Sequence, residues 1–115
     1  MSVKLDRYNS SFVREISYIL KNEIKDNDIN FVTINACEIT SDLSLARVYF
    51  TVLDDSKKVE TLSALNKASS FIRGKLSGRV EIRHTPELKF IYDNSIAYGR
   101  HIENIIDEIH EKGNN

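Results

Sequence analysis

The chain has 115 residues, which is enough for one domain with a modest core, and 41% of them are hydrophobic. Charged residues make up 29% of the chain, yet the formal net charge is only −1. This balance excludes a polycation that binds nucleic acid indiscriminately, so local charge must carry any such binding. A lone cysteine, Cys37, excludes an internal disulfide and indicates a reducing compartment.

The first part of the chain predicts a helix followed by two strands. Apolar residues recur every three or four positions from Leu5 to Ile24, which indicates an amphipathic helix of about twenty residues. Turn-forming residues at 26–28 end it. The segment 31–39 then alternates with period two, Val32, Ile34 and Ala36 against Thr33, Asn35 and Cys37. A short turn leads to a second alternating run, which predicts an antiparallel hairpin with Arg47, Tyr49 and Thr51 on the outer face.

The second part of the chain predicts two further helices, a strand and a final helix. Asp54, Asp55 and Ser56 can cap a helix with a buried stripe of Val59, Leu62, Leu65 and Ala68. We expect a break at Ala68, Ser69 and Ser70, where a serine caps a short helix through Phe71, Ile72 and Leu76 that Gly78 ends. Pro86 suits a strand start, which places the third strand at residues 87–92. A final helix with an isoleucine stripe follows Ser95, and residues 113–115 should fray.

Positive charge is concentrated in one part of this sequence. Residues 67–100 hold 7 Lys or Arg against 3 Asp or Glu, whereas the segments on either side are acidic. A phosphate backbone requires several cations spread over one surface. The expected phosphate contacts are Lys67, Arg73, Lys75 and Arg79, joined by the hydroxyl or backbone groups of Ser69 and Ser70. Further candidates are Arg83 and His84, with a weaker outer-sheet patch of Arg47 and Lys89. A merely solvated surface is the alternative.

Three stretches carry a family resemblance: VTINACEITSDLSLARVYFTV (32–52), LNKASSFIRGKL (65–76) and IRHTPELKFIYD (82–93). With the first helix and the last segment in the expected order, the chain resembles ribosome-binding factor A over nearly its whole length. The resemblance implies a type II KH-like, two-layer α+β sandwich with a three-stranded sheet, ordered α-β-β-α-(kink)-α-β-α, as one domain over residues 1–112. In that family an Ala-x-Gly kink replaces the usual GxxG clamp. Here Ser70 stands at the glycine position, so we expect a cap there.

The resemblance also implies a function. By it the chain would be a non-enzymatic, monomeric RNA-binding protein of the cytoplasm that needs no cofactor. It would bind 16S rRNA on the free 30S subunit and assist late rRNA maturation, including 5′-end processing. No catalytic or metal-ligand spacing stands out, and no run approaches the roughly 18 apolar residues of a membrane span.

Two other functions remain open from the residues alone. One is a free-standing KH-like regulator of other RNAs, against which the missing GxxG clamp counts. The other is a protein-interaction module that docks through the isoleucine stripe of the final helix. That stripe would be exposed in the second case and part of the core otherwise.

Overall fold

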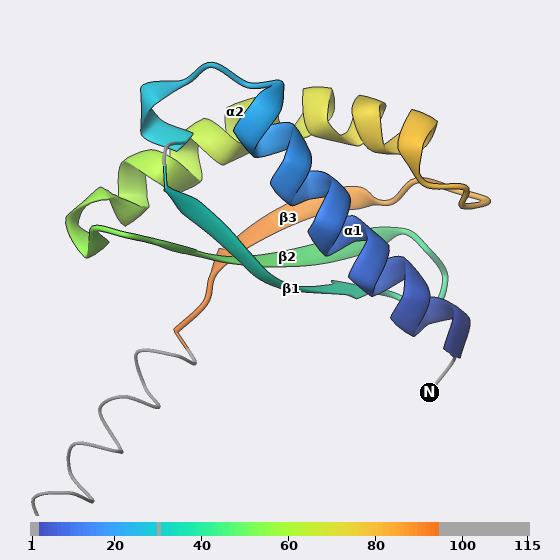
Figure 1. Ribbon diagram of the computed structural model, residues 1–115. Coiled ribbons are helices and arrows are strands. Elements are labelled where there is room, and N and C mark those ends of the chain that lie inside the picture. The colour runs from blue at the N-terminus through green and yellow to red at the C-terminus, as the bar shows by residue number, and fades with distance from the viewer. Residues whose placement is uncertain (1–2, 30, 95–115) are drawn as a thin grey trace, which may run out of the picture.

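Two helices and three strands make up the part of the chain that the computed structural model describes, which is residues 3–29 and 31–94. Their bounds are α1 Val3–Asn22, β1 Val32–Ile39, β2 Leu45–Val52, α2 Lys58–Arg79 and β3 Glu87–Tyr92. Short 3-10 turns at Asn27–Ile29 and Asp55–Lys57 precede β1 and α2. Both helices lie over one face of the sheet (Figure 1). The predicted two-layer α+β architecture is therefore confirmed, as are the first helix and the bounds of the third strand.

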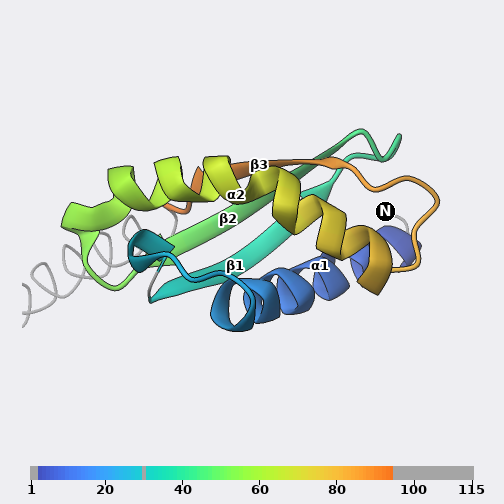
Figure 2. The same ribbon diagram turned by 90° about the horizontal axis from the view of Figure 1, so that it is seen from above.

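The sheet is mixed, with β2 at its centre. β1 pairs with β2 in the predicted antiparallel hairpin, and β2 pairs with β3 in parallel. A parallel pair requires a crossover connection, which α2 and the loop after it supply. The crossover places α2 on the same side of the sheet as α1, as the view from above shows (Figure 2).

The period-two alternation of β1 is interrupted by a bulge. The register with β2 shifts between Ile34 and Ala36, so that Asn35 is the extra residue. After this shift Cys37 and Ile39 are buried, whereas Ala36 is exposed. The predicted grouping of Ala36 with Ile34 on one face is wrong, because a single inserted residue moves every later side chain to the opposite face.

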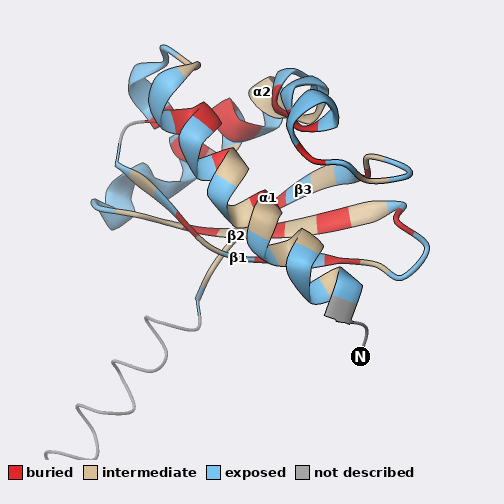
Figure 3. Ribbon diagram, turned by 45° about the vertical axis from the view of Figure 1, so that its right-hand side comes forward, coloured by how far each residue is buried: buried red, intermediate tan, exposed pale blue. Residues whose placement is uncertain are grey.

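The core lies between the helices and the inner face of the sheet. Burial is complete for three α1 residues of the predicted stripe, Phe12, Ile16 and Ile19, and for Val48 and Phe50 of β2. Figure 3 shows these buried inner sides in red and the outer sides of the helices in pale blue.

The inner face of α2 differs in detail from its prediction. Leu65 of the predicted stripe is fully buried, and so are Ile72 and Leu76 further along the helix. Val59, however, is 70% exposed and Phe71 46% exposed, while Thr61 is buried instead. Val59 was predicted wrongly because it lies in the first turn of α2, directly after the 3-10 turn at Asp55–Lys57, and the buried residues of the helix begin only at Thr61.

The predicted break in the second helix is wrong. α2 is one continuous helix of 22 residues, and Ala68, Ser69 and Ser70 lie inside it. Ser70, the expected cap, is an interior residue of this helix. Ser69 does not cap a new helix either, because its hydroxyl donates to the carbonyl oxygen of Asn66 at 2.8 Å. Such back-bonding bends helices, and the axis of α2 changes direction in its yellow-green to yellow stretch (Figures 1 and 2).

The ends of α2 also correct the prediction. Asp54 acts as the expected cap, but of the 3-10 turn, where its carboxylate accepts from the backbone N–H of Ser56. Gly78 does not end the helix, which continues to Arg79. The predicted final helix and the predicted domain limit at residue 112 lie outside the described residues. None of the described helices has an apolar run long enough to cross a membrane.

Candidate nucleic-acid interface

The outer side of α2 carries positive charge without acidic neighbours in sequence. Between Glu60 and Glu81 the chain has four cations, Lys67, Arg73, Lys75 and Arg79, and no acidic residue. Lys67 and Lys75 are exposed, and within residues 3–29 and 31–94 neither forms an ion pair. These two lysines are therefore available to an anionic partner.

A row of small residues lies on the same helix face as Lys67. Residues three and four apart share a face of a helix, which aligns Ser70, Gly74 and Gly78 with that lysine. All three are exposed, and a Cβ added at either glycine would meet nothing within 4 Å. A phosphate backbone could therefore approach this face closely. The backbone N–H groups here are paired within the continuous helix, so side chains rather than a helix end must make the contacts.

An exposed aromatic ring stands beside this row. The ammonium nitrogen of Lys75 lies 5.5 Å from the centroid of the Phe71 ring, a cation–π arrangement. Phe71 is 46% exposed, so it offers a ring on which a base could stack next to a cation.

Arg73 fixes the loop after α2 instead of facing solvent. Its Nε and Nη2 atoms donate to the carbonyl oxygen of Thr85 at 3.1 and 2.8 Å. This pair of hydrogen bonds holds the loop of residues 80–86 against the helix. A shallow hollow of about 390 Å³ results, lined by Ser70, Arg73, Gly74, Ser77, His84 and Thr85. The structure thus brings His84 to the candidate surface, and it gives Arg73 a positioning role.

Arg79 lies one turn beyond Lys75 on α2, but its side chain contacts α1. Its guanidinium group pairs with Glu23, lies 3.6 Å from the Glu15 carboxylate, and stacks 4.8 Å from the centroid of the Tyr18 ring. All three partners belong to α1 or its end, so Arg79 joins the two helices. The pairing offsets its charge, and a phosphate would have to compete with two carboxylates for Arg79.

Arg47 and Lys89 lie on the outer face of the sheet, away from both helices. Arg47 is opposite Lys89 in the parallel register of β2 and β3, and opposite Glu38 in the antiparallel register of β1 and β2. Hydrogen bonding to the Glu38 carboxylate also raises the pKa of Tyr49. The predicted second patch therefore exists as a cluster, but it includes a carboxylate and is separate from α2.

The sequence prediction overlooked Gly74 and Ser77 as surface residues. Their spacing from Ser70 was a usable signal, because four and seven residues along a helix return to the same face. The partners of Arg73 and Arg79 lie in the loop after α2 and in or just after α1. A local sequence pattern cannot predict such contacts.

The fold and the lysine-bearing helix face define a small α+β domain of the type II KH-like class. Residues 4–106 match the family model described as Ribosome-binding factor A. The chain belongs to that family. Ribosome-binding factor A of Staphylococcus carnosus is 43% identical over 111 residues, which is 96% of each chain. The protein of the same description from Staphylococcus saprophyticus is 42% identical over 113 residues, covering 97% of this chain and 99% of its own.

Solved structures agree with this assignment. The crystal structure of ribosome-binding factor A from Thermus thermophilus is similar with a TM-score of 0.71 at 22% identity, covering 76% of this chain and 94% of that one. A Thermus thermophilus ribosome-binding factor A homology model, fitted into the cryo-EM map of a 30S complex, gives a TM-score of 0.61 at 21% identity over 83% of this chain and 97% of its own. These likenesses show a shared fold.

Proposed function

We propose that this protein binds RNA of the free 30S ribosomal subunit and acts as an assembly factor. The observation that carries the proposal is the exposed face of α2, where Lys67 and Lys75 flank a low surface of serine and glycine. Family membership supports it, as does the relative that was fitted into the map of a 30S complex.

The proposed binding is mainly electrostatic. Each phosphate contact releases condensed counterions, so several unpaired cations on one face give affinity that falls steeply with salt. Lys67, Lys75, Arg83 and His84 are the contacts that we propose, with Ser70 as a hydroxyl partner. Ser69 is excluded because its hydroxyl already bonds within the helix. Arg47 and Lys89 form a separate, weaker contact on the outer sheet face.

The finer role that we propose is help with late 16S rRNA maturation, including its 5′ end. A protein that prefers one rRNA conformation raises the population of that conformation, and it needs neither a cofactor nor a chemical step for this. We infer a monomeric, cytoplasmic protein that acts by binding. A ligand of this kind must leave before the subunit enters translation, since it stabilises the immature arrangement.

Gradient sedimentation of cell extract containing the tagged protein tests the proposal. The protein should peak with free small subunits and be absent from complete ribosomes. The variant Lys67→Ala/Lys75→Ala should bind purified small subunits roughly tenfold more weakly, with a salt slope reduced by about 2. A matched control is Lys25→Ala/Lys57→Ala, which removes the same charge from exposed positions outside α2.

The sedimentation result tests the function, and the comparison of the variant with the control tests the assigned surface. Wild-type protein that does not sediment with free small subunits would contradict the function itself. Equal binding by the variant and the control would show that another surface makes the contact.

A further inference from the structure

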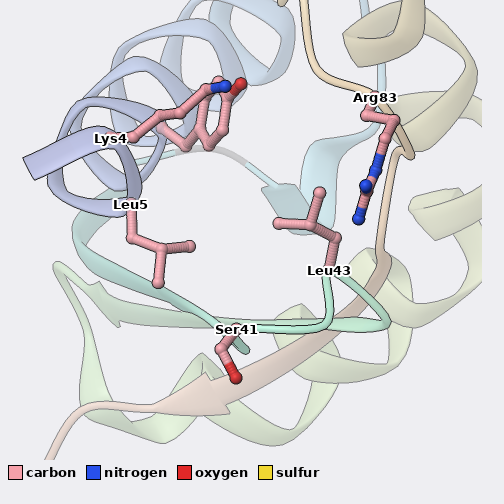
Figure 4. A pocket seen from close by; sticks show the side chains of 6 residues that line it. Lys4, Leu5, Ser41, Leu43 and Arg83 are labelled. Carbon is pink, nitrogen blue, oxygen red and sulfur yellow. The ribbon is translucent and has the colours of Figure 1, made fainter. Parts of the chain in front are cut away.

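A second hollow lies at one end of the domain, where three segments distant in sequence meet. The start of α1, the turn between β1 and β2, and the loop after α2 enclose about 340 Å³. The residues that line it are Lys4, Leu5, Tyr8, Ser41, Leu43 and Arg83. Figure 4 shows Lys4 and Leu5 on the helix at one side, with Leu43 and Arg83 across from them.

The apolar wall at Leu43 is held in an unusual backbone conformation. Leu43 has a φ of 62°, in the left-handed region that a bulky residue rarely adopts. The turn around it is fixed by hydrogen bonds: the N–H of Leu43 donates to the Thr40 carbonyl at 2.9 Å, and Asp42 accepts from the hydroxyls of Thr40 and Ser44. Such conformations persist where the surroundings over-determine them, and they concentrate at functional positions. Here Leu43 lines the hollow with one edge, while the rest of its side chain is buried in the core at 8% exposure.

The charges of the hollow are of one sign. Lys4 and Arg83 are exposed, and neither forms an ion pair within the part of the chain that the structure describes. Among the residues that the structure describes, no acidic side chain lines the hollow. Two carboxylates adjoin lining residues in sequence, those of Asp6 and Asp42. The Asp42 carboxylate accepts hydrogen bonds from the hydroxyls of its own turn, and the exposed Asp6 is not among the residues that line the hollow. The lining therefore combines an aromatic and aliphatic wall with two cations.

We propose that this hollow binds one unpaired nucleotide of the RNA, with its base against Tyr8 and Leu43 and its phosphate between Lys4 and Arg83. A planar ring that carries an anionic group matches both halves of the lining. The proposal rests on the proposed function, because the loop that bears Arg83 is the one that Arg73 holds to α2. An RNA strand that crosses α2 could thus continue into the hollow.

Solution NMR of the full-length protein tests the hollow directly. Adenosine monophosphate should give saturable shifts of the Leu43 methyl and Tyr8 ring signals, and it should bind about tenfold more tightly than inorganic phosphate because of stacking. The variant Leu43→Asn should abolish this preference, since asparagine tolerates the left-handed conformation but removes the wall. Lys25→Ala, at an exposed position outside both proposed surfaces, is the control and should leave nucleotide binding unchanged. Thermal melts verify that each variant is folded.

Subunit binding separates this proposal from the function on which it rests. Leu43→Asn should weaken binding about threefold or more without changing the salt slope, because no charge is removed. If Lys67→Ala/Lys75→Ala weakens subunit binding while the nucleotide does not shift the Leu43 and Tyr8 signals, the nucleotide site is contradicted and the proposed function is retained. Equal affinity for phosphate and nucleotide would reduce the hollow to an anion site and overturn the proposal. Tighter binding of N-acetyl-phenylalanine than of the nucleotide would overturn it in favour of a peptide terminus.

Discussion

Replacing Arg79 with alanine should destabilise the protein and leave its proposed RNA contacts intact. The guanidinium group of Arg79 pairs with Glu23 and Glu15 and stacks on Tyr18. The three charged side chains are only 22–30% exposed, so these pairs are worth more than fully solvated ones. One oxygen of Glu23 is buried without a hydrogen-bond partner among the described residues, and this carboxylate would lose its cation.

The expected loss follows from these contacts. After discounting for solvent screening, the two ion pairs together contribute about 0.5–1 kcal/mol. The contact between the guanidinium group and the ring contributes about 0.5–1 kcal/mol. Leaving the carboxylate without its cation costs about 1 kcal/mol. The free energy of unfolding should therefore fall by about 2–3 kcal/mol. For a domain of this size the melting temperature should fall by roughly 10 °C.

Denaturant and thermal unfolding followed by circular dichroism measure this change. Lys67→Ala serves as the control and should stay within about 0.5 kcal/mol of wild type, because its side chain is exposed. A double-mutant cycle with Glu23→Gln should give a coupling energy above about 0.5 kcal/mol. If Arg79→Ala melts like wild type and weakens subunit binding as much as Lys67→Ala/Lys75→Ala, then Arg79 is a phosphate contact and its assignment to the helix–helix contact is wrong.

Three further changes test other parts of the structure. Arg73→Ala should speed amide hydrogen exchange in the loop of residues 81–85 and lower the free energy of unfolding by about 1–3 kcal/mol. Arg73→Lys should not restore the protection from exchange, because lysine lacks the forked donor of arginine. Burial raises the pKa of the Cys37 thiol to about 12, so iodoacetamide at pH 8.5 should modify the folded protein roughly a thousandfold more slowly than the unfolded one; equal rates would contradict its burial. Hydrogen bonds from Thr40 and Ser44 lower the pKa of Asp42 to about 2, so its ionised form stabilises the fold above about pH 4 and this is lost as pH falls toward 2. Asp42→Ala should lower the melting temperature at pH 7, and a difference that persists at pH 2 would refute this cause.

Local pattern was sufficient for the elements with a simple period. The third strand was predicted with its observed bounds because Pro86, which lacks a backbone donor, marks its start. The first helix followed from the recurrence of apolar residues on one face. In β1 the same reasoning failed after Asn35. The Asn35 side chain donates to the Asp93 carboxylate at 3.0 Å. Because that partner is 58 residues away, the apolar alternation within the strand could not predict the bulge.

The helix break failed for a different reason. A serine hydroxyl both accepts and donates, so Ser69 could cap a new helix or bond back to the preceding turn. A break would also leave backbone groups at two new helix ends unpaired, and burial of Leu65, Ile72 and Leu76 along one side favours the continuous helix. The candidate surface is changed by this outcome, because it loses a helix end and gains an uninterrupted outer face.

The four cations between Glu60 and Glu81 divide by side-chain chemistry. Arg73 and Arg79 form fixed, multi-point contacts with Thr85 and with two carboxylates, which suit a planar group with several donors. Lys67 and Lys75 remain at the surface, where a compact, hydrated charge on a flexible stem is favourable. A surface of this kind can follow a phosphate backbone but cannot read base edges, which require positioned donors. Any preference for one RNA conformation must then come from the shape of the α2 face and from the hollow at Leu43, the rigid parts of the proposed contact.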